Sequence, residues 1–116
     1  MTIEQSHRSP SRFQAIDHAL RAIELLRPSV LRLKKRDAHL ADQVRRALSN
    51  VCLNLGEGAY RAGGNQRLSF RRAAGEAHEA IIALEVAVAW RVLDVSEVAV
   101  GLDRLDHVLA ILAKLR

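Results

Sequence analysis

The stretch Phe13–Leu33, FQAIDHALRAIELLRPSVLRL, decides the fold class of this chain. Its large apolar residues recur at alternating steps of three and four, the spacing that places side chains on one face of an α-helix. Pro28 removes one helical hydrogen bond, but the apolar stripe continues beyond it. We therefore predict one helix over residues 12–35 that is kinked at Pro28. The alternative is two shorter helices separated at Arg27–Pro28.

The same spacing predicts three further helices, over residues 38–61, 66–93 and 97–114, with Gly63-Gly64 as the clearest break between them. Residues able to cap these helices precede them: Asp37, Asn65 and, as alternatives for the last helix, Asp94 or Ser96. Helices joined by short connections pack as antiparallel neighbours. The predicted fold is therefore all-α, an antiparallel up-down-up-down four-helix bundle over residues 12–116 that follows a flexible segment at residues 1–11.

Size and composition limit the class of protein. The chain of 116 residues is the size of one domain, and 49% apolar with 27% charged residues is an ordinary globular composition. The single cysteine, Cys52, excludes an internal disulfide and a zinc site built on several thiolates. The sequence contains no uninterrupted run of about 18 apolar residues, the length that a membrane-spanning helix needs. Its first residues do not read as a secretory signal. We therefore expect a cytoplasmic protein that does not contact membranes.

The predicted third helix has more apolar surface than a four-helix monomer needs. Residues 80–93 read AIIALEVAVAWRVL, in which only Glu85 and Arg91 are charged. A helix that is apolar all round is normally buried all round. We therefore predict that its outer face is a subunit interface. The expected interface residues are Ile82, Val86, Ala89 and Trp90.

The net charge of +5 arises in the first half of the chain, where residues 1–62 hold 11 Lys and Arg against 6 Asp and Glu. A localised basic excess favours a polyanionic partner, most often nucleic acid. Few aromatic residues accompany the basic ones, so we expect phosphate contacts rather than base stacking. The residues expected to bind nucleic acid are Arg32, Lys34, Lys35, Arg36, Arg45, Arg46, Arg61, Arg67, Arg71 and Arg72.

No pattern in the sequence predicts a catalytic residue, a cofactor or a metal. The histidines form no pair at the spacing of a helical metal site, and no phosphate-binding glycine loop is present. Asn54 and Glu57 lie three residues apart, on one helical face beside inward apolar residues. We interpret them as part of a buried polar network, because a buried carboxylate needs a partner. Arg46 and Arg72 are the candidate partners.

Two segments resemble a known family. Residues 43–61, QVRRALSNVCLNLGEGAYR, resemble the signature Q-[IL]-R-R-A-x-x-S-[IV]-x-x-N-I-A-E-G of the four-helix bundle proteins encoded in intervening sequences of 23S rRNA genes. Residues 73–84, AAGEAHEAIIAL, resemble the later A-x-G-S-x-x-E-L segment of that family. The matching residues are Gln43, Arg45, Arg46, Ala47, Asn54, Glu57, Gly58, Gly75 and Glu79. The departures are Asn50 for Ser (unless Ser49 takes that place), Gly56 for Ala and Glu76 for Ser.

This resemblance covers about residues 12–115 and implies a bundle that assembles as a ring, typically a pentamer. The family includes relatives of the accessory protein of diversity-generating retroelements, a basic pentameric barrel that binds nucleic acid and a reverse transcriptase. We therefore expect a non-enzymatic homo-oligomeric scaffold that binds RNA or DNA through its basic surface. One alternative is a module that docks a protein partner, such as a nucleic-acid enzyme. Another is an enzyme whose site forms between subunits around Asn54, Glu57 and His78.

Overall fold

The structure is a computed structural model that describes residues 13–115. These residues form four helices, α2 (Gln14–Arg36), α3 (Ala38–Ala59), α4 (Gly63–Ala89) and α5 (Val95–Ala113). All regular structure in the described range is helical. The flexible segment expected at residues 1–11 lies outside the described residues, as does the expected first helical residue at position 12.

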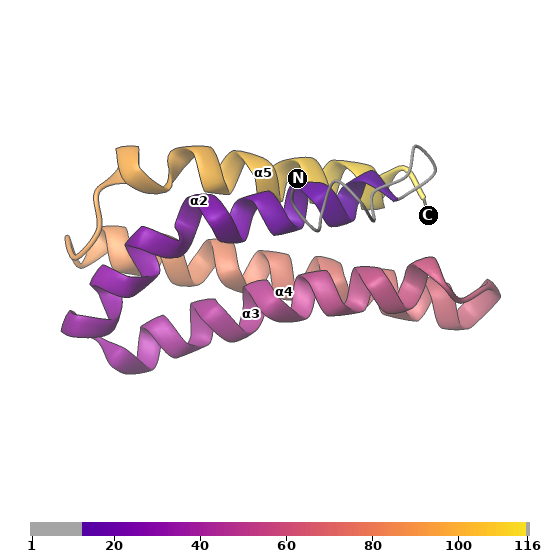
Figure 1. Cartoon of the computed structure of the whole chain (residues 1–116), viewed down its shortest axis with the longest axis horizontal. Helices are drawn as coiled ribbons and strands as arrows, with labels where there is room; N and C mark the ends of the chain where they lie inside the picture. The colour runs from indigo at the N-terminus through magenta and orange to yellow at the C-terminus, as the bar shows by residue number, and fades with distance from the viewer. Residues whose placement is uncertain (1–12, 116) are drawn as a thin grey trace, which may run out of the picture.

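The four helices run alternately in opposite directions, with α2 beside α5 in one layer and α3 beside α4 in the other (Figure 1). The α2–α3 and α4–α5 connections lie at one end of the bundle, and the α3–α4 turn lies at the other. This arrangement confirms the predicted all-α four-helix bundle. Within residues 13–115, no helix combines the length and the apolar character needed to cross a membrane.

The first helix, α2, continues through Pro28 to Arg36, so the alternative of two shorter helices is wrong. Its innermost residues are mostly small: Ala15, Ala19, Ala22, Leu26, Ser29 and Leu33. The larger Phe13, Ile16 and Ile23 of the predicted stripe are only half-buried and pack along the sides of the core. Alanine at the centre lets helix backbones approach one another, and the bulky side chains then close the flanks.

The helix α4 begins at Gly63, three residues before the predicted start. Gly63 has a φ of +61°, in the left-handed region that glycine adopts without steric cost. Asn65 lies inside the first turn, so the prediction that it caps this helix is wrong. Instead, the Gln66 side-chain amide donates to the carbonyl oxygens of Gly58 at 3.1 Å and Arg61 at 2.9 Å. These two bonds fasten the start of α4 to the end of α3.

The same helix ends at Ala89, four residues before the predicted end at Leu93. The Arg91 N–H donates to the Val88 carbonyl at 2.9 Å, and the Val92 N–H donates to the Ala87 carbonyl at 3.0 Å. This pair of bonds is the Schellman termination of a helix. Arg91 has a φ of 61°, the conformation that glycine usually supplies at this position. Because no glycine marks the end of α4 in the sequence, the prediction from apolar spacing alone extended this helix too far.

Two predicted caps are present. The Asp37 carboxylate accepts a hydrogen bond from the Leu40 N–H at 3.0 Å and begins α3. Asp94 precedes α5, and its N–H donates at 3.2 Å to the Glu97 carboxylate, the reciprocal bond of a capping box. The alternative cap, Ser96, lies within α5 and is wrong.

The core is aliphatic and runs the length of the bundle. The helix α3 buries a row of aliphatic residues, namely Leu40, Val44, Ala47, Leu48, Val51 and Leu55. The helix α4 buries chiefly alanines, namely Ala73, Ala77, Ala80, Ala83 and Ala87, together with Leu84 and Ser69. This alanine face turns the larger apolar residues of α4 toward its flanks and its outer surface.

Candidate nucleic-acid interface

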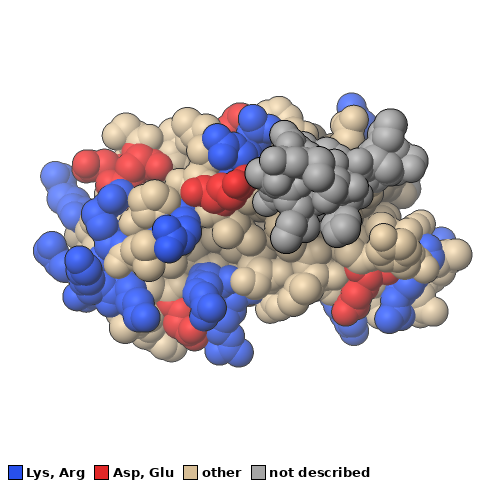
Figure 2. Space-filling view, in the orientation of Figure 1, with Lys and Arg blue, Asp and Glu red and all other residues tan. Residues whose placement is uncertain are grey.

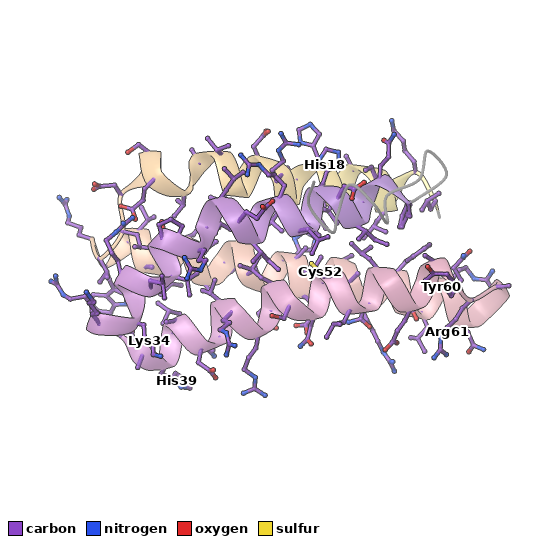
Figure 3. All side chains as sticks on the ribbon, in the orientation of Figure 1. His18, Lys34, His39, Cys52, Tyr60 and Arg61 are labelled. Atoms are coloured by element: carbon purple, nitrogen blue, oxygen red, sulfur yellow. The ribbon has the colours of Figure 1, made fainter. Side chains whose placement is uncertain are left out.

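A basic corner, formed by Lys34, Lys35 and Arg36, lies where α2 ends and the chain turns into α3. All three side chains are exposed, and none makes an ion pair with another described residue. Positive side chains suit this position because the carbonyl end of a helix carries partial negative charge. Figure 2 shows Lys and Arg side chains gathered at this end of the molecule, and Figure 3 shows Lys34 there.

The neighbouring predicted arginines differ in whether their charge is already paired. Arg32 bonds Glu97 at the start of α5, and the Ser29 hydroxyl donates to the same carboxylate at 2.9 Å. These bonds, chiefly the one from Arg32, hold the pKa of the Glu97 carboxyl below its usual value. Arg46 lies 3.5 Å from Asp42, one turn earlier on α3. Arg45 is exposed and has no ion pair within the described chain.

The other predicted cations, Arg61, Arg67, Arg71 and Arg72, lie at the opposite end of the bundle and are called the far-end arginines below. All are exposed without an ion pair to any of residues 13–115. Figure 3 shows Lys34 at one end and Arg61 at the other. The 22 residues of α3 separate Arg36 from Arg61 by about 33 Å, whereas Arg45 and Arg46 lie within the first half of α3. Arg71 and Arg72 lie within the first half of α4, which runs back along α3. The ten predicted residues therefore divide between the two halves of the bundle, six toward the α2–α3 connection and four toward the α3–α4 turn.

Within residues 13–115, Asn54 and Glu57 do not form the predicted buried polar network. Glu57 is exposed and pairs with neither Arg46 nor Arg72. The physical reason is helical geometry, because Glu57 follows buried Leu55 by two residues and so lies about 200° further round the helix. Asn54 is half-buried and donates to the Asn50 carbonyl at 2.8 Å, a bond within its own helix.

The two remaining polar residues of the motifs are on the surface. Gln43 and Glu79 are exposed, on α3 and α4 respectively. A hydrogen bond with the neighbouring Glu76 carboxyl raises the pKa of Glu79. The motif residues singled out by the resemblance are thus mostly exposed polar groups.

The predicted interface residues form an exposed apolar surface on α4. Ile82 is 59% exposed, Val86 is 38% exposed and Trp90 is 75% exposed. Ala89 is also exposed. Ile82, Val86 and Trp90 are spaced by four residues and so follow one side of the helix. We call these three residues the α4 ridge.

A second feature, which the sequence pattern did not reveal, is a groove of about 590 Å³ between α4 and α5. Its lining residues are Arg67, Phe70, Arg71, Ala74, His78, Leu109, Ala110, Leu112, Ala113 and Leu115. The lining is apolar apart from Arg67, Arg71 and His78, and it contains no carboxylate. This α4–α5 groove depends on how two helices distant in sequence pack, so periodicity within one helix gave no sign of it.

Two histidines, which the sequence left unpaired, meet between α2 and α5. The rings of His18 and His107 stack with their centroids 5.0 Å apart, and an Arg104 guanidinium nitrogen lies 3.1 Å from His18 Nδ1. Burial, with smaller contributions from the charges of His107 and Arg104, lowers the pKa of His18. Figure 3 shows His18 at the α2–α5 layer, away from both basic groups.

The remaining candidates for chemistry have structural settings. Cys52 is half-buried, and burial raises the pKa of its thiol to about 11. A thiol with so high a pKa stays protonated at neutral pH and is a poor nucleophile. No cluster of three or more His, Cys, Asp or Glu side chains in the described part of the chain is arranged to hold a metal ion.

The fold and these surfaces define a four-helix bundle with two basic ends, an exposed apolar ridge and a cationic groove. Comparison of the chain with known protein families, curated proteins and solved structures finds no match.

Proposed function

We propose that this protein is a non-enzymatic homo-oligomeric scaffold whose basic corner binds RNA or DNA through phosphate contacts. The observation that carries the proposal is the set of three adjacent cations, Lys34, Lys35 and Arg36, exposed and without partners at one end of the bundle. Unpaired cations keep their full charge available to phosphates. No aromatic side chain lies between them, which favours backbone contacts over base stacking.

The scaffold part of the proposal is supported by the α4 ridge. An exposed apolar row on a helix whose opposite face is already in the core favours contact with another protein surface. The sequence resemblance to the bundle proteins of rRNA intervening sequences implies a ring, typically a pentamer. In a ring each basic corner would be repeated once per subunit, which would multiply weak phosphate contacts.

The test is a fluorescence-anisotropy titration of the protein with short RNA and DNA duplexes at several salt concentrations. We expect the logarithm of affinity to fall linearly with the logarithm of salt concentration. Replacing Lys34, Lys35 and Arg36 by Gln should weaken binding and reduce that slope by roughly 2.7 for a DNA duplex if all three contact phosphates, about 0.9 for each contact.

The matched control replaces Arg61, Arg67 and Arg72 by Gln. This variant loses the same three charges from the opposite end of the bundle, so it separates local phosphate contact from net charge. We expect it to bind more tightly than the corner variant. Absence of binding at low salt, or equal losses in the two variants, would contradict the assignment to the basic corner.

A second candidate function is docking of a protein partner, and the α4–α5 groove is the observation that favours it. The groove has a mainly apolar lining, and its charged groups are Arg67 and Arg71 of α4. A fitting partner is an amphipathic helix with an apolar face and acidic flanks. If Ala74→Arg, which would fill the groove, abolished binding of such a peptide while Ala99→Arg did not, this function would gain support.

A further inference from the structure

The α4 ridge has acidic neighbours. Glu79 precedes Ile82 by three residues and Glu85 follows it by three, so both carboxylates lie beside the ridge on the helix surface. Both side chains are exposed. A surface that docks on this ridge should therefore offer an apolar recess with positive charge at its rim.

Such a recess exists between α2 and α3. This α2–α3 groove has a volume of about 250 Å³ and is lined by Ile23, Arg27, Val30, Leu31, Arg45, Leu48 and Ser49. Its volume is below the roughly 300–1,000 Å³ of a typical small-molecule site, so it suits protein side chains better than a cofactor. Leu31 is 48% exposed at the groove, which leaves apolar surface open.

The charges of the two surfaces are opposite. The charged residues of the α2–α3 groove are Arg27 and Arg45, both exposed and without an ion pair among residues 13–115. On α4 itself the charged residues beside Ile82 are Glu79 and Glu85, and the charge of Arg46 on α3 acts on Glu79. Complementary charge around apolar contact gives an interface its orientation and discourages contact of like surfaces.

The two surfaces also lie at the same level of the bundle. The groove uses the second half of α2 and the first half of α3, and the ridge uses the second half of α4. These halves all approach the end that contains the α2–α3 and α4–α5 connections (Figure 1). Two copies placed side by side can therefore bring ridge and groove together without sliding along the bundle axis.

We propose that the α4 ridge of one copy docks into the α2–α3 groove of a second copy. This inference rests on the proposed homo-oligomeric scaffold and names the surfaces that build it. Because ridge and groove are different parts of the chain, each copy offers one donor and one acceptor surface. A contact of this heterologous kind produces a closed ring when its rotation closes and a filament when it does not.

The decisive experiment uses one variant for each surface. The ridge variant carries Ile82→Asp and Val86→Asp, and the groove variant carries Leu31→Asp and Ser49→Asp. All four positions are at the surface, and circular dichroism would verify that each variant is folded. Light scattering coupled to size-exclusion chromatography should show an oligomer for the natural chain and a monomer for each variant alone.

Mixing the two variants distinguishes a heterologous contact from other modes of assembly. The ridge variant keeps an intact groove and the groove variant keeps an intact ridge, so one productive contact remains. We expect a discrete 1:1 dimer in the mixture. Leu53→Asp is the matched control, because Leu53 is an apolar side chain 63% exposed on α3 that belongs to neither surface. It should assemble like the natural chain.

The fluorescence of Trp90 gives an independent measurement of assembly, since Trp90 is the single tryptophan of the chain. Its emission should shift to shorter wavelength on assembly of the natural chain and in the 1:1 mixture. Full assembly of either surface variant alone, or a mixture that stays monomeric, would overturn the ridge-to-groove contact while leaving the scaffold intact. A natural chain that is monomeric at all concentrations would overturn the proposed scaffold as well. Nucleic-acid binding would still be tested separately by the anisotropy titration.

Discussion

Two glycines are required by the side chains that pack on them. A Cβ added at Gly101 on α5 would overlap the end of the Leu26 side chain, and one added at Gly58 on α3 would overlap the Phe70 ring. Gly101 is a buried residue within α5, where glycine by itself weakens a helix. The structure shows that its lack of a side chain lets α2 and α5 approach at the centre of the core. Gly75, by contrast, is exposed and has open space around it.

Gly101→Ala should destabilise the protein by about 1–3 kcal/mol, the usual cost of overfilling a packed core. The matched control, Gly75→Ala, should stabilise it by roughly 0.5–1 kcal/mol, because alanine loses less backbone freedom than glycine in a helix. Urea denaturation of both variants at one protein concentration measures the difference. Equal stability of Gly101→Ala and the natural chain would show that Leu26 can move aside without cost.

At the scale of elements, the packing of α2 on α5 combines apolar contact with polar groups at two levels. Near the α5 start, Glu97 accepts from Ser29 and Arg32 of α2. Further along, His18 stacks on His107. The sequence places no two histidines within four residues, so only the antiparallel pairing of α2 with α5 brings them together. Polar contacts of this kind depend on protonation, and they make the α2–α5 layer sensitive to pH.

The lowered pKa of His18 predicts a loss of stability on acidification. The charged groups around His18 are His107, Arg104 and Asp103 of α5 and Asp17 of its own helix. Below pH 6.5, the usual value, the unfolded chain takes up a proton at His18 while the folded chain still resists it. Stability should therefore fall as pH drops below about 6.5, and the fall should end once pH is below the folded pKa.

Thermal unfolding at a series of pH values from about 8 to about 5 would measure this effect, because histidines titrate in that range. His18→Gln should flatten part of the decline, since the amide does not titrate. His39→Gln is the control, because His39 is exposed near the start of α3, away from His18 (Figure 3). Identical pH dependence in the His18 variant and the natural chain would contradict a role for His18.

At the scale of the whole molecule, the surface divides into regions of different character. Positive charge gathers at the end that contains the basic corner (Figure 2), and apolar surface is exposed along α4. The ridge and the α2–α3 groove lie at the level of the basic corner. Assembly through them would therefore bring the basic corners of neighbouring copies to one side of the oligomer, where phosphate contacts of several subunits could act together.

If assembly buries the α4 ridge, folding and association are coupled. The melting temperature of the natural chain should then rise with protein concentration, because binding of a second copy stabilises only the folded state. Differential scanning calorimetry across a broad concentration series is the measurement. The ridge variant, Ile82→Asp with Val86→Asp, should melt at the same temperature throughout. A natural chain whose melting temperature is independent of concentration would argue against coupled assembly.

The sequence by itself determined the local structure and the interior of this protein. Apolar spacing located four helices, and the side chain of Asp37 identified where α3 begins, because these signals act within one or two helical turns. The same spacing failed where the signal was missing: no glycine marks the end of α4, and Arg91 adopts the left-handed conformation instead. It also assigned Glu57 to the interior, although the rotation of α3 after Leu55 directs it to solvent.

Only the tertiary structure decided which distant residues meet and which charges remain free. The sequence identified ten basic residues, but the packed helices divide them between the two halves of the bundle, and Glu97 pairs with Arg32 from another helix. Both grooves and the histidine pair likewise form between helices. Periodicity describes the faces of one helix, whereas these features depend on the order, rotation and separation of packed helices. For that reason the fold followed from the sequence, and the arrangement of its surfaces required the assembled bundle.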